Sequence, residues 1–437
     1  MKSQIMTVIL CLLECWKMIR LLSLFSGIGA FESALRRGGY QFETVNYCEI
    51  DPYAAKAYSQ IHGISEDYNL HDVRKVNTLL MDNINLVTYG FPCQDISVAG
   101  KQKGFEHDGE RTRSGLFFEA LRIIEFLQPE YAICENVKAL TSKKFTAEFQ
   151  TVLSGLSKAG YNNYWEVLNA KDYGIPQNRE RVFIVSIRKD IDTGAFTFPE
   201  KQELKLRVKD MLEPVVDEKY YINNERAESL IQQILAKTDI GDIEGVDSTI
   251  NDPKVKDISN CIKARYDAGI ENQRSVGTAV IEPKIKRLGN LYDENAGGAR
   301  AGNVYAPDGL APALQTAQGG MSNTLTTVHK DNLVVEPINY ESDGTARTIK
   351  SQYYKTSTAN FERTGTHGAT RVLDVTNYRI RKLTPRECFR LMGFTDADFD
   401  KIHGISNTQL YKMAGNSIVV NVLEAIFKQL FKENHKE

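Results

Sequence analysis

The sequence predicts a doubly wound α/β domain followed by a smaller, irregular domain. Over residues 18–188, short β-branched or apolar runs alternate with helical stretches, as in a parallel sheet covered by helices on both faces. After about Phe198 the long strand patterns stop, and Gly, Ser, Thr, Asn and Asp dominate over 238–368. Helical patterns return from Thr384, so we expect the end of the chain to pack against the first domain.

Six segments have the apolar, β-branched pattern of strands buried in a sheet. They span residues 20–25, 44–49, 86–90, 131–135, 164–169 and 181–188. A weaker segment at 70–73 is expected to come third in chain order, which makes 86–90 the fourth strand. Asp51 followed by Pro52 predicts a helix start, as do Thr384 and Ser417, and apolar residues at 117–127 repeat at helical spacing.

The composition limits the class of protein. A chain of 437 residues with 42% hydrophobic residues can bury a core large enough for two domains. Its net charge of −2 lacks the positive excess typical of nucleic-acid binders, so any basic surface has to be local. The arginine-rich stretch 371–390 is one candidate, although a solvated charged face has the same composition.

Cysteine usage points to a reducing compartment. The seven cysteines are an odd number without CxxC spacing, which argues against a disulfide framework and a structural zinc site. No apolar run approaches the roughly 18 residues of a membrane span, and the apolar segment 5–13 lacks the cleavage site of a signal peptide. We therefore expect a cytoplasmic monomer without a metal or a membrane partner. Met18 directly precedes the first strand, so we expect translation to begin there and 1–17 to be an extension outside the fold.

Two glycines and an acidic residue follow the first two strands. Phe25-Ser-Gly-Ile-Gly-Ala lies between a strand and a helix, where a glycine turn and a helix amino end can hold a nucleotide-like ligand. Gly27 and Gly29 are also compatible with a plain tight turn, because the third glycine of the dinucleotide fingerprint is missing. Glu49 ends the second strand, where a carboxylate can accept hydrogen bonds from ribose hydroxyls. Together they favour an adenosyl cofactor.

A cysteine stands at the carboxyl end of the fourth predicted strand. The segment Phe-Pro-Cys-Gln-Asp places Cys93 beside the first strand, and therefore beside the cofactor. A free cysteine is most often a small buried hydrophobic residue. Here, however, Glu135 ends the next strand at the same edge, and Gln177, Arg179 and Arg181 cluster where the last strand begins. A nucleophile, an acid and two cations at one sheet edge indicate a covalent catalytic site.

These segments resemble the cytosine-5 DNA methyltransferase family. The resemblance rests on Pro-Cys at 92–93, Glu-Asn-Val at 135–137, Gln-x-Arg-x-Arg at 177–181, Leu-Thr-Pro-Arg-Glu-Cys at 383–388 and Gly-Asn-Ser at 415–417. Matching segments occur in the family's order over 18–188 and 378–427, somewhat more than half of the chain. The motifs are highly specific, and they imply a Rossmann-like α/β methyltransferase that uses S-adenosylmethionine.

The resemblance also implies a division of the chain and a cofactor pocket. A catalytic domain would span 18–197, a variable target-recognition domain 198–377, and 378–437 would return to the catalytic domain. The residues implied to line the pocket are Phe25, Gly27, Gly29, Glu49, Ile50, Asp72, Pro92, Leu116, Asn416 and Ser417. The family often has an aromatic residue where Ile50 stands.

The implied reaction is methyl transfer to carbon 5 of a cytosine flipped out of double-stranded DNA. Carbon 5 is a poor nucleophile, but attack of the Cys93 thiolate on carbon 6 makes the ring an enamine that accepts a methyl group. Glu135 would donate a proton or a hydrogen bond near N3. Arg181 would point at the O2 carbonyl, and Arg179 would hold the site together and lower the thiol pKa below about 8.5. At this point the two arginine roles are interchangeable.

The loop 94–113 is expected to help extrude the base from the duplex. It combines glycines with lysines and arginines between the nucleophile and the helix near Leu116, although an ordinary mobile loop has a similar composition. The residues expected to contact DNA are Gln94, Ser97, Lys101, Lys103 and Gln177. In the second domain, glycines allow close approach to base edges, and polar side chains can read the major groove.

Related functions are weighed against this one. A transfer-RNA cytosine-5 methyltransferase has the same catalytic set, but the large variable domain disfavours it. A catalytically silent DNA-binding relative is expected to have lost part of that set, which is complete here. A zinc cytidine deaminase is set aside, because residue 96 is isoleucine rather than the second cysteine of Pro-Cys-x-x-Cys. A restriction-modification setting implies a separate restriction endonuclease as a possible partner.

Overall fold

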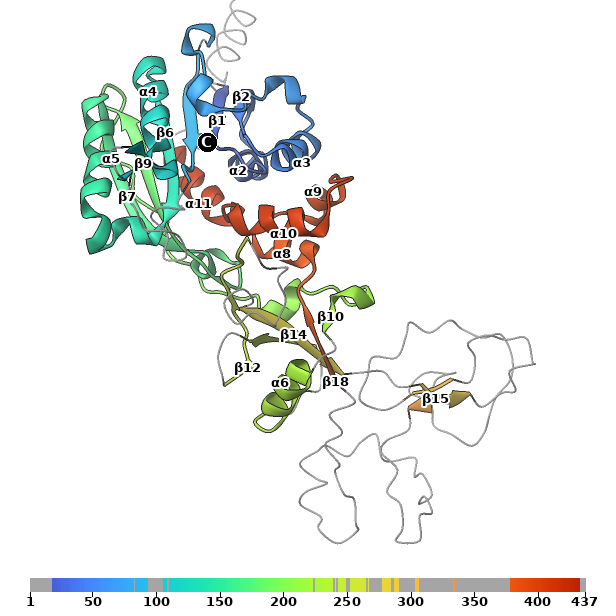
Figure 1. Cartoon of the computed structure of the whole chain (residues 1–437). Coiled ribbons are helices and arrows are strands. Elements are labelled where there is room, and N and C mark those ends of the chain that lie inside the picture. The colour runs from blue at the N-terminus through green and yellow to red at the C-terminus, as the bar shows by residue number, and fades with distance from the viewer. Residues whose placement is uncertain are drawn as a thin grey trace, which may run out of the picture.

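Two larger sheets organise the described part of the chain, beside three sheets of two or three strands each. The computed structural model describes residues 18–432 except 82, 93–104, 108–109, 223–224, 239, 241–242, 249–251, 265, 267–276, 284–286, 291–302, 306–332 and 335–377. Figure 1 shows helices α8 (Pro385–Leu391), α10 (Asn407–Asn416) and α11 (Val420–Leu430) between the larger sheet and the second sheet. Within the described ranges, no helix combines the length and the apolar character needed to cross a membrane.

The larger sheet has six strands in the order β2-β1-β3-β6-β9-β7. Their bounds are β1 (Ile19–Leu24), β2 (Phe42–Cys48), β3 (Leu86–Tyr89), β6 (Tyr131–Val137), β7 (Tyr161–Asn169) and β9 (Glu180–Arg188). These are the six strands predicted from the sequence, with ends that differ by a few residues. β1 pairs in parallel with both β2 and β3, so the strand that leads to Pro92 lies directly beside the first strand, as predicted.

Helices cover both faces of this sheet. The helices on one face are α2 (Ala30–Arg37), α3 (Pro52–His62) and α11, and those on the other are α4 (Phe117–Leu127) and α5 (Thr146–Lys158). Neighbouring strand residues point into different cores: Leu21 packs with the first set of helices, whereas Leu22 packs with the second. Asp51 accepts a hydrogen bond from the Tyr53 amide at the start of α3, which confirms the predicted cap.

The weak strand predicted at 70–73 is wrong. His71 has a left-handed backbone with φ of 55°, which interrupts an extended chain. The Asp72 carboxylate then accepts the Arg74 amide and begins a turn of 3-10 helix at Val73–Lys75. The strand before Pro92 is therefore the third in chain order, not the fourth.

The last strand in chain order runs against the others, which corrects the expectation of a parallel sheet. β9 is antiparallel to both of its neighbours, β6 and β7. The link from β7 to β9 is too short for the crossover helix that a parallel pair requires. As a result, the start of β9 meets the end of β6, and Arg181 lies opposite Val137. This reversal is what brings the two arginines to the edge where Glu135 lies.

The second sheet has five strands in the order β10-β18-β14-β11-β12. Their bounds are β10 (Tyr221–Ile222), β11 (Glu244–Asp247), β12 (Lys254–Val255), β14 (Thr278–Pro283) and β18 (Tyr378–Lys382), and helix α6 (Glu225–Leu235) contacts β18. The segment 378–382, expected to return to the catalytic domain, is thus a central strand of the second sheet. After it come α8, α9 (Asp396–Asp400), α10 and α11; Ser417 caps the end of α10 instead of opening the last helix.

The arginines of the stretch 371–390 that the structure describes form ion pairs within the protein. Arg379 pairs with Glu218 and Glu282, and Arg390 pairs with Asp396. Their partners come from distant segments or later turns, so the local excess of positive charge in the sequence is neutralised in the fold. Among the described residues of this stretch, the charges stabilise the second sheet and α8; they do not form a free basic face.

The most buried of these ion pairs joins β18 to α8. The Arg381 and Glu387 side chains are both fully buried, and two guanidinium nitrogens donate to the two carboxylate oxygens at 2.9 Å. Glu387 also completes a capping box with Thr384, which confirms the predicted helix start. Breaking a buried pair from one side leaves a charge without a partner.

We expect Arg381→Ala to lower the free energy of unfolding by about 3–5 kcal/mol, because Glu387 would remain buried and uncompensated. Urea unfolding followed by circular dichroism measures this change. Lys219→Ala is the matched control in the second domain, because Lys219 pairs with Asp217 in solvent and should leave unfolding unchanged. Equal effects of the two substitutions would show that the buried pair does not hold α8 to the sheet.

Candidate active site

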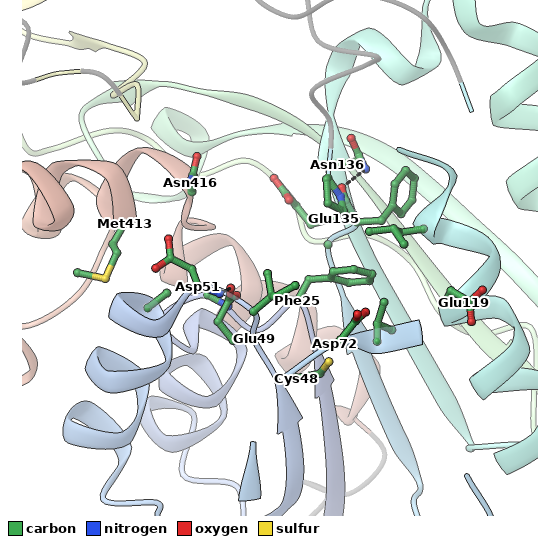
Figure 2. Close-up of a pocket in the computed structure, with 18 of the residues that line it drawn as sticks. Phe25, Cys48, Glu49, Asp51, Asp72, Glu119, Glu135, Asn136, Met413 and Asn416 are labelled. Carbon is green, nitrogen blue, oxygen red and sulfur yellow. Dashed lines mark hydrogen bonds between the residues drawn. The ribbon is translucent and has the colours of Figure 1, made fainter. Parts of the chain in front are cut away.

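One large pocket opens at the carboxyl ends of β1, β2, β3 and β6, and it has a volume of about 850 Å³. Figure 2 shows Phe25, Glu49 and Asp51 on one side of it and Glu135 with Asn136 on another. The predicted site residues that line it are Phe25, Gly27, Glu49, Ile50, Asp72, Pro92, Leu116, Glu135, Arg179, Arg181 and Asn416. The structure therefore brings the cofactor set and the acid–arginine set into one cavity.

The turn after β1 is held by Glu49. Phe25 and Gly27 both have left-handed backbones, with φ of 53° and 55°. The Gly27 amide donates to Glu49 Oε2 at 2.9 Å, and the Asp51 amide donates to Glu49 Oε1 at 2.8 Å. Burial raises the pKa of Glu49, and the nearby Asp51 charge adds to this, although the amide donors oppose it. A carboxylate is thus fixed at the sheet edge beside the glycine turn.

Gly29 and Ser417 do not line the pocket, but each contacts residues next to it. Gly29 has φ of 77° and precedes α2, and a Cβ atom there would overlap the imidazole ring of His62. Its role is therefore close packing, which the sequence could not distinguish from ligand contact. Ser417 is buried, and its carbonyl oxygen accepts a hydrogen bond from Arg179 at 2.6 Å.

Ile50 and Asp72 present different surfaces to the cavity. Ile50 is 68% exposed, so its aliphatic side chain is available as an apolar contact. The Asp72 carboxylate receives hydrogen bonds from the guanidinium and the amide of Arg74, and these lower its pKa. Arg74 also lines the pocket.

The edge of the sheet where β6 ends contains a close acid–arginine pair. Arg181 Nε lies 3.0 Å from Glu135 Oε1, with both side chains largely buried. Burial raises the pKa of Glu135, while Arg181 and Arg179 oppose this rise by favouring the carboxylate. A carboxyl group in this position can be protonated nearer to neutral pH than an exposed glutamate, so it can serve as a proton donor.

Arg179 is a buried clamp. Its guanidinium donates to the carbonyl oxygens of Ile262, Gly415 and Ser417, at 3.0, 3.0 and 2.6 Å, and to the sulfur of Cys261 at 3.2 Å. Burial lowers the pKa of Arg179, and the neighbouring Arg181 charge lowers it further. The four acceptors fix this side chain in place while one of its edges faces the pocket.

Asn136 ties the Pro-Cys segment to β6. Its side-chain amide donates to the Phe91 carbonyl oxygen at 3.1 Å, and its own oxygen accepts the Val137 amide at 2.9 Å. Phe91 and Pro92 are therefore held against the end of the strand that carries Glu135. The predicted nucleophile Cys93 follows directly. It lies outside the described residues, as do Gln94, Ser97, Lys101 and Lys103.

Gln177, expected at the DNA, is fully buried. Its amide nitrogen donates to the Leu391 carbonyl oxygen at 2.7 Å, and its amide oxygen accepts the Ile262 amide at 3.1 Å. Both polar atoms are therefore used inside the protein, and the side chain joins the start of β9 to α8 and to the second domain. It is not placed to reach a ligand.

Several lining residues were not identified from the sequence. Lys412 on α10 pairs with Asp51 at 2.6 Å, and both line the pocket. His71, Met413 and Gly415 also line it. Lys412 is separated from Asp51 by most of the chain, and no local pattern marks it. Of these four residues, Gly415 begins the Gly-Asn-Ser motif and Met413 lies two residues before it, so these two had a signal in the sequence.

The fold and the pocket define a class: a Rossmann-like α/β methyltransferase whose cofactor site and acid–arginine site share one cavity. The model of the C-5 cytosine-specific DNA methylase family matches residues 19–432. This match covers nearly the whole chain, which therefore belongs to the C-5 cytosine-specific DNA methylase family.

Curated relatives and solved structures agree with this assignment. The chain is 34% identical to the orphan methyltransferase M.SPRI of Bacillus phage SPR, over 94% of this chain and 97% of that one. It is 33% identical to the type II methyltransferase M2.ScrFI of Lactococcus lactis subsp. cremoris, over 83% and 71%. Among solved structures, the Entamoeba histolytica methyltransferase EhMeth has a TM-score of 0.59 at 18% identity, covering 96% of this chain and 100% of that one, which supports the fold.

The protein is thus a DNA methyltransferase that transfers a methyl group from S-adenosylmethionine to carbon 5 of cytosine. The pocket fits this cofactor. Its volume of about 850 Å³ lies in the range of small-molecule sites. It offers a glycine turn, a fixed carboxylate at Glu49 and an apolar side chain at Ile50, which are suited to an adenosyl group.

We expect Gly29→Ala to destabilise the protein more than Gly39→Ala does. Both glycines have positive φ, of 77° and 75°, so each substitution carries roughly 1–2 kcal/mol of backbone strain. A methyl group at Gly29 would also overlap His62, whereas Gly39 faces open space. Urea unfolding and calorimetric titration with S-adenosylmethionine measure the outcome; about tenfold weaker cofactor binding is expected for Gly29→Ala only. Equal effects would mean that Gly29 does not shape the cofactor turn.

Proposed function

We propose that Cys93, Glu135, Arg179 and Arg181 carry out the methyl transfer. The observation that supports this best is the Glu135–Arg181 pair at 3.0 Å, which lines the same cavity as the cofactor set. The peptide leading to Cys93 is tied to this edge through Asn136 and Phe91. Because Pro92 lines the cavity, the nucleophile that follows it in the sequence would be attached to the chain at the cavity wall.

The reaction then has three stages. The Cys93 thiolate adds to carbon 6 of the cytosine, forming a sulfur–carbon bond and turning carbon 5 into a nucleophile. Bound S-adenosylmethionine supplies the methyl group that carbon 5 takes up. Loss of the proton from carbon 5 and departure of the thiolate restore the double bond. The charge that builds on the ring during addition has to be met by groups already in place.

Glu135 stabilises this charge near N3. Burial raises the pKa of Glu135, which favours the protonated carboxyl more than in an exposed glutamate, so it can give a proton or a hydrogen bond to N3 as the thiolate adds. Arg181 holds the carboxyl through Oε1, and its guanidinium is the group that can reach the O2 carbonyl. Arg179 is enclosed by backbone carbonyls, which favours a holding role for Arg179 and the O2 contact for Arg181.

The cofactor contacts follow the walls of the pocket. We assign direct contact to the lining residues Phe25, Gly27, Glu49, Ile50, Asp72, Pro92, Leu116 and Asn416. Gly29 and Ser417 act on the cofactor only through the shape of the turn and of the end of α10. Glu49 is the residue with an anchored carboxylate that suits ribose hydroxyls.

The second domain is proposed to recognise the DNA target. We place 18–197 in the catalytic domain and 198–382 in the target-recognition domain, because β18 is a strand of the second sheet, and we return 383–432 to the catalytic domain. In the loop after Cys93, we retain Gln94, Ser97, Lys101 and Lys103 as proposed DNA contacts. Gln177 is not among them, because both of its polar atoms bind within the protein.

Double-stranded DNA is the proposed substrate, and the protein is proposed to act on it as a monomer in the cytoplasm. One chain supplies every residue of the pocket described above. The relatives include both an orphan and a type II methyltransferase, so either setting suits this chain. A separate restriction endonuclease is therefore proposed as a partner only if its gene accompanies this one.

We expect wild-type protein to methylate cytosine within one short sequence of host DNA, and Cys93→Ser to abolish this methylation. The serine hydroxyl is too weak a nucleophile to add to carbon 6 under these conditions. Bisulfite sequencing of host DNA after expression detects the modified sites. Unmethylated DNA from folded wild-type protein would contradict a DNA substrate and direct the search to RNA; equal methylation by both proteins would remove Cys93 from the mechanism.

We expect Glu135→Gln to lower kcat/KM by about 100-fold or more, because an amide cannot transfer a proton to N3. In wild type, activity should fall as pH rises through the raised pKa of Glu135, since the protonated form is the active one. This falling limb should be absent in Glu135→Gln. Tritium transfer from labelled S-adenosylmethionine between about pH 5 and 9 measures both effects. An unchanged alkaline limb in the variant would assign it to another group.

A further inference from the structure

A segment of the second domain enters the active site. β13 (Ser259–Asn260) pairs in parallel with β8 (Gln177–Asn178), immediately before the two arginines. The Ser259 amide donates to the Pro176 carbonyl oxygen at 2.8 Å, and the Ile262 amide donates to Gln177 at 3.1 Å. The chain from 259 to 262 is therefore bonded along its length to the strand start that carries Arg179.

The next residues of this segment pack against the end of α10. A Cβ atom at Gly415 would overlap the backbone of Ala264 and Lys263, so glycine permits a backbone contact that no larger residue would allow. Gly415 lines the pocket, and its carbonyl oxygen accepts from Arg179. Cys261 is consequently enclosed between the start of β9 and the end of α10.

The sulfur of Cys261 is directed at both arginines. It accepts a hydrogen bond from Arg179 Nη1 at 3.2 Å and lies 4.0 Å from Arg181 Nη2. Arg181 in turn pairs with Glu135 through its Nε. The other acceptors of the Arg179 guanidinium, in the described part of the chain, are backbone carbonyls. Cys261 is thus a side chain of the second domain that reaches the acid–arginine pair.

The electrostatic surroundings of Cys261 differ from those of the other described cysteines. Burial alone would raise the pKa of its thiol, but the Arg179 and Arg181 charges outweigh burial and lower it. Burial raises the pKa of Cys48, Cys134 and Cys388 above the ordinary range. A polarised sulfur next to two cations is a strong acceptor, whereas the other three thiols are packed like small apolar groups.

We propose that Cys261 is a positioning residue for the methyl transfer, holding Arg179 and Arg181 in register with Glu135 and linking the target-recognition domain to the catalytic edge. This inference rests on the proposed roles of those three residues. Cys261 forms no bond to the substrate and does not replace Cys93.

Two substitutions separate the acceptor from the volume of the side chain. Cys261→Val fills the space but removes the acceptor, and Cys261→Ser keeps an acceptor in a smaller side chain. Ser259→Ala is the matched control, because Ser259 is fully buried in the same segment and its hydroxyl has no hydrogen-bond partner. Thermal melting of each purified protein establishes that it is folded; if Cys261→Val does not fold, Cys261→Ala replaces it.

The single-turnover rate of methyl transfer is measured with saturating S-adenosylmethionine and an unmethylated DNA duplex that contains the target sequence identified in host DNA. The Kd of each ligand is measured alongside. We expect Cys261→Val to slow transfer about tenfold or more while both Kd values stay within about twofold, and Cys261→Ser to recover most of the rate. Ser259→Ala should match wild type. If Cys261 only fills space, Cys261→Val should transfer at the normal rate and Cys261→Ser should have a lower melting temperature.

The inference is overturned if Cys261→Val transfers at the wild-type rate, if Ser is as slow as Val, or if Ser259→Ala is equally slow. Failure of the proposed function gives a different result. In that case Arg181→Ala and Glu135→Gln retain normal transfer, whatever the Cys261 variants do. Normal transfer by the Cys261 variants alone, with loss in Arg181→Ala and Glu135→Gln, refutes only the role of Cys261.

Discussion

The buried guanidinium of Arg179 determines how the parts of this protein meet. It donates to carbonyl oxygens of Ile262, Gly415 and Ser417, which belong to the second domain and to the end of α10. Removing a cation from water costs several kcal/mol unless polar partners replace the lost hydration, so the three carbonyls have to stay in place for Arg179 to stay buried. The pocket wall therefore depends on segments separated by more than two hundred residues, and a shift in any one of them reaches the catalytic edge.

Much of the main sheet could be predicted because its signals are local. Buried strands such as β3 and β6 are short apolar runs, and Asp51-Pro52 and Thr384-Pro385 mark helix starts by capping chemistry that involves only neighbouring residues. The direction of β9 was missed, because periodicity does not report strand direction. The short connection between the predicted strands 164–169 and 181–188 was the signal that could have indicated an antiparallel pair. The stretch 371–390 misled for a related reason: its arginines are locally in excess, but their carboxylate partners come from segments such as Glu218 and Glu282.

In the candidate site too, residues with a local sequence signal could be predicted, and those brought in by tertiary packing could not. Glu135 and the two arginines were proposed from the reactive residue types in their motifs, whereas the parallel sheet expected from the sequence would have placed the start of β9 at the opposite edge from Glu135. Lys412 and Cys261 were missed, because each approaches the site only through tertiary packing and has no neighbour in the sequence that marks it. Gln177 and Gly29 show the converse: a residue inside a motif can be retained for packing or for internal hydrogen bonds and need not touch a ligand.

Two buried glutamates in one cavity illustrate how the surroundings set the chemistry. Burial raises the pKa of both Glu49 and Glu135. Glu49 receives backbone amides at both oxygens and has Asp51 beside it, so it is fixed in orientation and offers acceptor positions that hydroxyl groups can use. Glu135 faces guanidinium groups instead. These groups can stabilise negative charge on the carboxylate or on a ring nearby. The same residue type is thus suited to holding a ligand at one end of the pocket and to moving a proton at the other, and this difference follows from the donors that each carboxyl meets.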